Sequence, residues 1–203
     1  RDLHRHPELG YEEQETVRRV LAFMGDLPGA EVRTGLAGTG MTVTFGAGLD
    51  GPGVALRADM DALAMEEASG VPWASEIPGR MHACGHDGHT AMLLGAARHL
   101  AETRAFEGTV VFCFQPAEEN GAGARAMIED GLLRRFPVAR AFALHNWPGL
   151  PAGHIALKDG PVLASADAFR ITVEGQGGHA ALPHAARDPI VAGSALVLAL
   201  QSI

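Results

Sequence analysis

Hydrophobic residues follow two different periods along the chain, and each period predicts a different kind of element. Residues 12–25 carry valine, leucine and methionine at helical spacing behind a run of glutamates, which predicts a helix. Residues 53–58, 108–115 and 139–145 are apolar without alternation, a pattern typical of strands buried on both faces. Two shorter strand-like segments flank the glycines of residues 35–40. Because a strand and not a helix follows these glycines, they favour a turn over a phosphate-binding loop.

Helices are predicted between the strands. Residues 86–102 open with a polar turn and continue as a helix that is expected to bury Met92 and Leu93, among others. Residues 123–136 predict another helix. Strands without alternation that are separated by helices indicate a mostly parallel sheet covered by helices. We therefore predict an α/β fold.

The hydrophobic pattern changes near residue 164. Residues 165–176 alternate like a strand with one solvent-facing side, and residues 188–203 predict a helix with proline in its first turn. The pattern predicts two domains, residues 1–163 and residues 164–203.

The charge and the cysteine count narrow the class of protein. A formal net charge of −8 argues against a nucleic-acid or anionic-membrane partner. No apolar run reaches the roughly 18 residues that span a bilayer. No signal peptide is visible at Arg1. The two cysteines cannot form a disulfide framework, and Cys113 lies in an apolar run where a reduced thiol is expected. These features favour a cytoplasmic protein.

Residues able to bind a metal follow three of the predicted strands. The carboxyl ends of parallel strands meet at one edge of a sheet, and ligands bind there. A thiol, imidazoles and carboxylates together suit Zn²⁺, or Mn²⁺ and Co²⁺ when oxygen ligands are more numerous. The residues concerned are Asp59 and Asp61, Glu118 and Glu119, His145, and the pair Cys84 and His86 before a predicted helix.

Each of these residues has a simpler interpretation when it is taken alone. Adjacent glutamates are often a solvated helix start, and His145 could be a hydrogen-bonded core histidine. His82 and His89 flank the cluster and could either bind metal or hydrogen-bond to it. His4 and His6 are expected to be surface or packing residues. The coincidence at three strand ends favours a metal site over these separate interpretations.

Six segments, in this order along the chain, resemble a known family. They are "DLHRHPELGYEE", "LRADMDAL", "MHACGHDGHTAMLLGAA", "FQPAEENGAGARAMIEDG", "ALHNWPGLPAG" and "VEGQGGHAALPH". Together the segments resemble the metal-dependent amidohydrolases of the aminoacylase and carboxypeptidase superfamily. The branch they resemble most is that of hippurate hydrolase and the indole-acetyl-amino-acid hydrolases. The fold implied is a zinc-exopeptidase-like catalytic domain followed by the start of a smaller α+β lid or dimerisation domain.

The resemblance also implies a role for individual residues. The metal ligands of a two-metal centre correspond to Cys84, His86, Glu119 and His145. Glu118 corresponds to the general base, and Asp61 to an aspartate that orients the site. His179 corresponds to a lid-domain histidine that polarises the substrate carbonyl, in relatives often from the partner subunit. Most of the superfamily has a histidine ligand where this chain has Asp59.

The reaction implied is hydrolysis of the amide bond of an N-acyl or N-aroyl amino acid. Water activated by two divalent ions, Zn or Mn with Ni or Co as further options, would give up its proton to Glu118. The resemblance implies a small-molecule substrate and a homodimer. Family members are roughly twice as long as these 203 residues, so we expect a longer, active parent protein and weak or absent activity for this chain alone.

Other functions remain open on the sequence alone. The nearest are a di- or tripeptidase and a desuccinylase of the same superfamily. A catalytically incomplete metal-binding or dimerisation fragment is a further alternative. Turnover that depends on Glu118 would separate the enzymes from the fragment.

Overall fold

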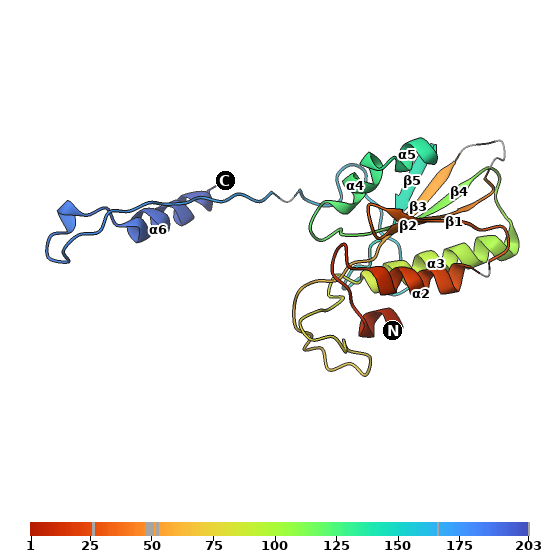
Figure 1. Ribbon diagram of the computed structural model, residues 1–203, viewed down its shortest axis with the longest axis horizontal. Helices are drawn as coiled ribbons and strands as arrows, with labels where there is room; N and C mark the ends of the chain where they lie inside the picture. The colour runs from red at the N-terminus through yellow and green to blue at the C-terminus, as the bar shows by residue number, and fades with distance from the viewer. Residues whose placement is uncertain (26, 48–50, 52, 166, 203) are drawn as a thin grey trace. The chain divides into compact units, whose positions relative to one another are not determined.

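A five-stranded mixed sheet forms the framework of residues 1–150 (Figure 1). The computed structural model describes residues 1–25, 27–47, 51, 53–165 and 167–202. The strands lie in the order β1-β2-β4-β3-β5. Their bounds are Glu31–Leu36 (β1), Gly40–Phe45 (β2), Val54–Asp59 (β3), Val110–Gln115 (β4) and Arg140–Ala143 (β5).

The parallel half of the sheet contains the three strands that the sequence predicted to lead to the site. β3 pairs in parallel with β4 on one side and with β5 on the other. Asp59, the last residue of β3, lies opposite Gln115, the last residue of β4, so both strands end at the same edge. β1 and β2 form a hairpin that joins β4 by antiparallel pairing. The predicted α/β fold is confirmed, with a sheet that is mixed.

Helices cover both faces of this sheet (Figure 1). One face carries α2 (Gln14–Met24) and α3 (His86–Thr103), and the other carries α4 (Gly123–Glu129) and α5 (Leu132–Arg135). A short helix, α1 (Asp2–Arg5), begins the chain. The larger core lies under α2 and α3, and Phe45, Phe112 and Phe114 are fully buried in it. A smaller cluster, which includes Cys113, packs against α5 on the other face. Burial of about 150–250 Å² by each aromatic ring makes the larger core the main source of stability.

Two predictions about the helices need correction. Residues 123–136 form two helices, because Gly131 between them has a φ of 96°, which lies outside the helical range. Met92 is 44% exposed, because α3 directs Leu93 and Ala97 toward the sheet and Met92 away from it. The turn predicted over residues 35–40 is confirmed. Gly35 and Gly38 have φ values of 84° and 85° there.

Residues 151–203 form a second compact unit. Its elements are a 3₁₀ turn, η1 (Pro183–Ala185), and the predicted helix α6 (Pro189–Leu200), with Asp188 accepting a hydrogen bond from the Ile190 N–H group. Within described residues 165 and 167–176, the predicted strand does not form, apart from a single bridge between Gln176 and Arg187. Alternation alone cannot make a strand, because a strand needs a neighbouring backbone to bond with. The boundary expected after residue 163 stays a prediction, and the compact units divide after Leu150.

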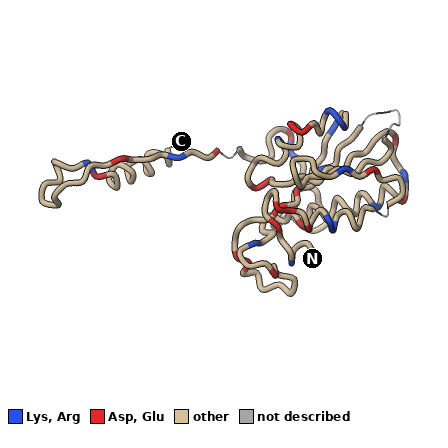
Figure 2. Tube along the Cα trace, viewed as in Figure 1, with Lys and Arg blue, Asp and Glu red and all other residues tan. Residues whose placement is uncertain are grey.

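Charged residues of both signs are dispersed along the first unit (Figure 2). None of the helices in the described part of the chain is both long enough and apolar enough to cross a membrane.

Candidate metal centre

The carboxyl-terminal edge of the parallel strands gathers the residues predicted to bind metal. Asp59 ends β3, Glu118 and Glu119 follow β4, His145 follows β5, and His86 opens α3. Among the described residues, three sets of three place one possible ligand atom each within 4.8 Å of the others, and His86 belongs to all of them. Two of the sets contain the residues predicted to bind metal. These two sets are Cys84, His86 and His145, and His86, Glu118 and Glu119.

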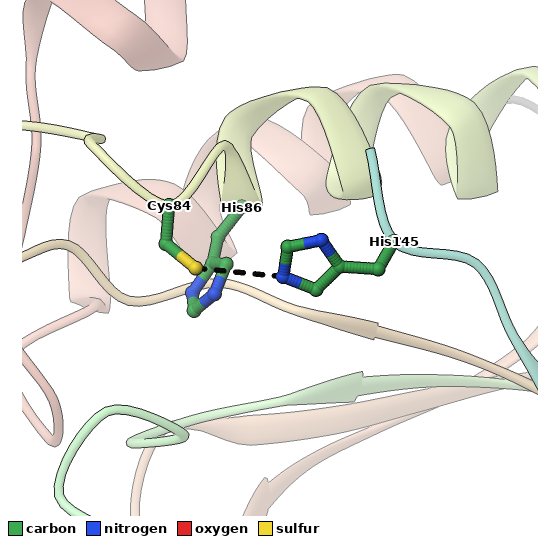
Figure 3. A group of neighbouring side chains, drawn as sticks. All are labelled: Cys84, His86 and His145. Atoms are coloured by element: carbon green, nitrogen blue, oxygen red, sulfur yellow. Dashed lines mark hydrogen bonds between the residues drawn. The ribbon is translucent and has the colours of Figure 1, made fainter. Parts of the chain in front are cut away.

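Cys84 and His86, at the start of α3, and His145, after β5, point toward one another (Figure 3). The Sγ atom of Cys84 lies 3.4 Å from Nε2 of His145. The other ring nitrogen of His145, Nδ1, donates to the main-chain oxygen of Asn146 at 2.7 Å. This bond selects the tautomer in which Nε2 carries a free lone pair, as a metal ligand must.

One ring nitrogen of His86 is likewise fixed by a hydrogen bond, which leaves the other available. Its Nδ1 donates to Oδ1 of Asp61 at 3.1 Å. Nε2 is buried and makes no hydrogen bond within the described part of the chain. It lies 3.7 Å from Oε1 of Glu119 and 3.9 Å from Oε2 of Glu118. Oδ2 of Asp59 also lies 3.7 Å away. Buried polar atoms are rarely left unpaired, so an imidazole nitrogen without a hydrogen bond that lies among three carboxylates fits a cation between them.

The electrostatics of the cluster also favour a cation. Burial works against a charge on His86, but the hydrogen bond to Asp61 and the nearby carboxylates raise its pKa. Burial and the charge of Glu119 raise the pKa of the Cys84 thiol to about 11. Burial also raises the pKa of Glu119. Without a cation, the raised pKa values disfavour the ionised forms of Cys84 and Glu119. A divalent metal would favour those forms, because its charge stabilises thiolate and carboxylate together. The residues therefore fit a divalent metal.

The two glutamates have different surroundings. The side chain of Glu118 is 42% exposed and that of Glu119 is 24% exposed. The main-chain N–H of Glu119 donates to Oδ2 of Asp61 at 2.9 Å. Asp61 thus accepts from His86 with one oxygen and, with the other, from the main chain of the loop that carries Glu118 and Glu119.

Asp59 and His89, with His86, form a third group whose atoms lie close together, but hydrogen bonds already occupy its outer members. Nδ1 of His89 donates to Oδ1 of Asp59 at 2.6 Å, and the N–H of Asn146 donates to Nε2 of His89 at 3.0 Å. Asp59 also pairs with Arg57, whose Nη1 lies 2.9 Å from its Oδ2. Burial alone would raise the pKa of Asp59. The hydrogen bond from His89 and the charge of Arg57 outweigh it and lower the pKa of Asp59 to about 2. Oδ2 of Asp59 also lies 3.7 Å from Nε2 of His86, so Asp59 borders the candidate metal position while His89 and Arg57 hold its oxygens.

Two histidines stand apart from these groups, and one residue that contacts them was not predicted. His82 is buried, belongs to none of the three groups, and has no hydrogen bond to either ring nitrogen within the described ranges. His179 lies in the second unit, where its Nδ1 accepts from the N–H of Ala181 at 3.1 Å. Asn146 was missed by the sequence analysis, and its position directly after His145 was the only available signal.

Comparison with known proteins agrees with this geometry. Residues 55–202 match Peptidase family M20/M25/M40, and the chain belongs to that family. It is 44% identical over 204 residues to N-acetylcysteine deacetylase of Bacillus subtilis, a match that covers 100% of this chain and 53% of that protein. It is 47% identical over 204 residues to the IAA-amino acid hydrolase ILR1-like 4 of Arabidopsis thaliana, covering 100% of this chain and 46% of the relative.

A solved structure shares the fold. The YXEP protein of Bacillus subtilis, described as a dinuclear metal binding peptidase from the M20 family, superposes with a TM-score of 0.74 at 44% identity. The superposition covers 79% of this chain and 44% of that one. The chain spans about half the length of the curated relatives it matches. The resemblance to metal-dependent amidohydrolases is thereby confirmed at the level of the family.

Proposed function

We propose that this chain carries the catalytic metal centre of an amidohydrolase that cleaves N-acyl or N-aroyl amino acids into a carboxylate and a free amino acid. The observation that carries the proposal is the orphaned Nε2 of His86, which faces Glu118 and Glu119 beside the Cys84–His145 pair. Relatives named for deacetylation of N-acetylcysteine and hydrolysis of IAA-amino acids support the substrate class.

Four residues would hold two divalent ions, with Zn or Mn the first choices and Ni or Co further ones. They are Cys84, His86, Glu119 and His145. When bound, such ions supply Lewis-acid activation of water and of the scissile carbonyl. A dinuclear metal site in a solved relative supports the number of ions.

The remaining residues would move protons and orient groups. Glu118, the more exposed of the two glutamates, takes a proton from water and returns it to the leaving amine. Asp61 fixes the tautomer of His86 and the direction of the loop at Glu119. His179 stabilises the developing charge on the carbonyl oxygen, in a homodimer from the partner subunit. The proposal includes a cytoplasmic location and neither nucleic-acid nor membrane partners.

The test compares the wild-type chain with Glu118→Ala and, as a matched control, Glu129→Ala. Glu129 is an exposed glutamate on α4 that pairs only with Arg125 among the described residues. Metal content is measured by elemental analysis, and hydrolysis is followed with hippurate, N-acetylcysteine, an indole-acetyl amino acid and a dipeptide. We expect up to two metals per chain in all three proteins. Turnover should fall by about 10²–10⁴ in Glu118→Ala alone.

The outcomes separate the alternatives. Turnover of the acyl amino acids that survives in Glu118→Ala removes Glu118 from the role of base. Preferential cleavage of the dipeptide favours a peptidase. Stoichiometric metal uptake without any hydrolysis favours a metal-binding fragment that needs the rest of a longer protein.

A further inference from the structure

The carboxylate of Glu13 lies outside the metal centre and contacts the loop that carries Glu118 and Glu119. The side chain is fully buried, with 0% of the residue exposed. Its Oε1 accepts a hydrogen bond from the N–H of Ala117 at 2.8 Å. Its Oε2 accepts from the hydroxyl of Thr39. A residue just before α2 is therefore bonded to the chain directly before the proposed base.

Glu13 is not used to cap its own helix. Glu8 does this, because its two carboxylate oxygens accept from the N–H groups of Glu15 at 3.1 Å and Thr16 at 2.7 Å. Among the residues that the structure describes, Glu13 makes no side-chain cap bond to α2. Burying a carboxylate is unfavourable, so a side chain needed only for packing would be apolar. The bonds to Ala117 and Thr39 are what the carboxylate contributes.

Ala117 needs such a bond, because its backbone is in a conformation that alanine rarely adopts. Its φ is 49°, in the left-handed region, which disfavours a residue with a Cβ by about 1–2 kcal/mol. Ala117 is buried and packs closely on Gly10, where an added Cβ would come within 2.9 Å of the Cα of Ala117. The surrounding contacts, with the hydrogen bond from Ala117 to Glu13 among them, hold this turn.

The conformation at Ala117 sets where the next two side chains go. The N–H of Ala117 is held by Glu13, and the N–H of Glu119 is held by Asp61. Glu118 lies between these two fixed points. The carboxylates of Glu13 and Asp61, from distant segments, thus accept hydrogen bonds from the N–H groups on either side of Glu118.

We propose that Glu13 is a positioning residue for the metal centre: its hydrogen bond to Ala117 places the side chains of Glu118 and Glu119 for binding metal. This inference rests on the proposed function, in which Glu119 is a ligand. Glu13 itself acts only through the backbone of Ala117.

The test is a titration of the chain with Co²⁺, followed by the visible and near-ultraviolet absorption that reports on ligand geometry and on thiolate binding. Three variants are compared with the wild type. Glu13→Met keeps the size of the side chain but removes both acceptors. Glu13→Gln keeps an oxygen for Ala117 and an amide that can donate to Thr39. Thr39→Val, the matched control, removes only the second bond.

We expect Glu13→Met to weaken Co²⁺ binding by about tenfold or more and to change the absorption spectrum. Glu13→Gln and Thr39→Val should stay close to the wild-type affinity and spectrum. Circular dichroism and thermal unfolding establish which variants are folded.

Three results would contradict the proposal. A folded Glu13→Met chain with the wild-type affinity and spectrum shows that the loop does not depend on Glu13. A Glu13→Gln chain with binding well below wild type shows that the hydrogen bond to Ala117 is not the relevant feature, and this arm stands even if the methionine variant fails to fold. A wild-type chain that takes up no Co²⁺ contradicts the metal centre itself, a different failure that removes the basis for both proposals.

Discussion

Asp61 shows how much one side chain contributes at the scale of single residues. Its two oxygens accept from different groups, the ring nitrogen Nδ1 of His86 and the main-chain N–H of Glu119. Burial opposes its charge, yet these hydrogen bonds lower the pKa of Asp61. The proposed ligands His86 and Glu119 are therefore coupled through an aspartate that need not bind metal itself.

Asp61→Asn tests this coupling. An asparagine can accept from His86 with its single oxygen, but its NH₂ group would then face the N–H of Glu119, and two donors cannot bond. We expect metal affinity to fall by about 10–100-fold with the fold preserved. Isothermal titration with Zn²⁺ measures the affinity, and unchanged affinity in the variant would show that Asp61 does not orient the ligands.

Glu13→Gln tests the electrostatics of the same region through stability. Burial is the largest influence on Glu13 and raises its pKa above the ordinary value, although its hydrogen bonds oppose this. A raised pKa means that the folded chain binds this proton more tightly than the unfolded chain does. The contribution of Glu13 to stability is complete below its unfolded pKa, near about 4.3, and is lost as pH rises through the folded pKa.

Glutamine cannot ionise, so Glu13→Gln should avoid that loss. We expect the variant and the wild type to have similar free energies of unfolding at acidic pH, and the variant to be the more stable at pH 8. Urea unfolding over a pH series gives both values. A Glu13→Gln variant that is less stable than the wild type at pH 8 would contradict the upward direction of the Glu13 pKa shift.

At the scale of elements, α4 and the loop before it are in very close contact. A Cβ added at Gly123, the first residue of α4, would come within 1.6 Å of the main-chain oxygen of Pro116 and 3.1 Å of that of Ala117. The first turn of α4 therefore packs directly against the backbone of the loop that carries Glu118 and Glu119.

Gly123→Ala should therefore be strongly destabilising, by about 3 kcal/mol or more, because main-chain atoms must shift. Gly95→Ala is the matched control. Gly95 lies inside α3 and is exposed. Apart from the backbone of α3 itself, an added Cβ would meet no atom of the described residues within 4 Å, so alanine there should stabilise the chain by about 0.5–1 kcal/mol. Denaturant unfolding of both variants measures the difference. Equal changes in the free energy of unfolding for the two substitutions would show that the loop backbone can shift at little cost to accommodate a Cβ at Gly123.

Elements could be predicted from the sequence where burial determines them. β3 and β4 have apolar side chains on both faces because both faces of the sheet are covered. The resulting run of apolar residues can be recognised in the sequence alone. The break at Gly131 and the absence of a strand over described residues 165 and 167–176 depend on backbone conformation and on partners, which hydrophobic pattern does not encode.

The candidate site was predictable to a similar degree. Strand ends and residue types brought Cys84, His86 and Glu119 forward as candidates, and the structure gathers them. Their hydrogen-bond partners were not predictable. Asn146 and Glu13 act through main-chain contacts to residues far away in sequence, and nothing in their own neighbourhood indicates those contacts.

At the scale of the whole molecule, a bound metal should link folding to metal supply. A ligand that binds only the folded chain stabilises it by about 2.7 kcal/mol at one hundred times its Kd. For a domain of this size, that corresponds to a rise in Tm of roughly 5–10 °C.

We expect Zn²⁺ to raise the Tm of the wild-type chain and a chelator to reverse the effect. Cys84→Ser should lose most of this response, because serine stays a neutral hydroxyl where the thiol can become a thiolate. Cys113→Ala is the control, since Cys113 is buried in the smaller core cluster on the other face of the sheet; it should lower the starting Tm and keep the response. Differential scanning calorimetry measures all three. A full Zn²⁺ response in Cys84→Ser would remove Cys84 from the ligand set.

The arrangement of strands in the sheet also bears on how the protein is made. Synthesis runs from the amino end, so the proposed ligands leave the ribosome in the order Cys84, His86, Glu119, His145. β5, which leads to His145, docks on β3, a strand completed some 80 residues earlier. With this ligand set, a nascent chain could hold metal loosely before residue 145 emerges and tightly only afterwards. Metal capture would then mark the moment at which the parallel half of the sheet is complete.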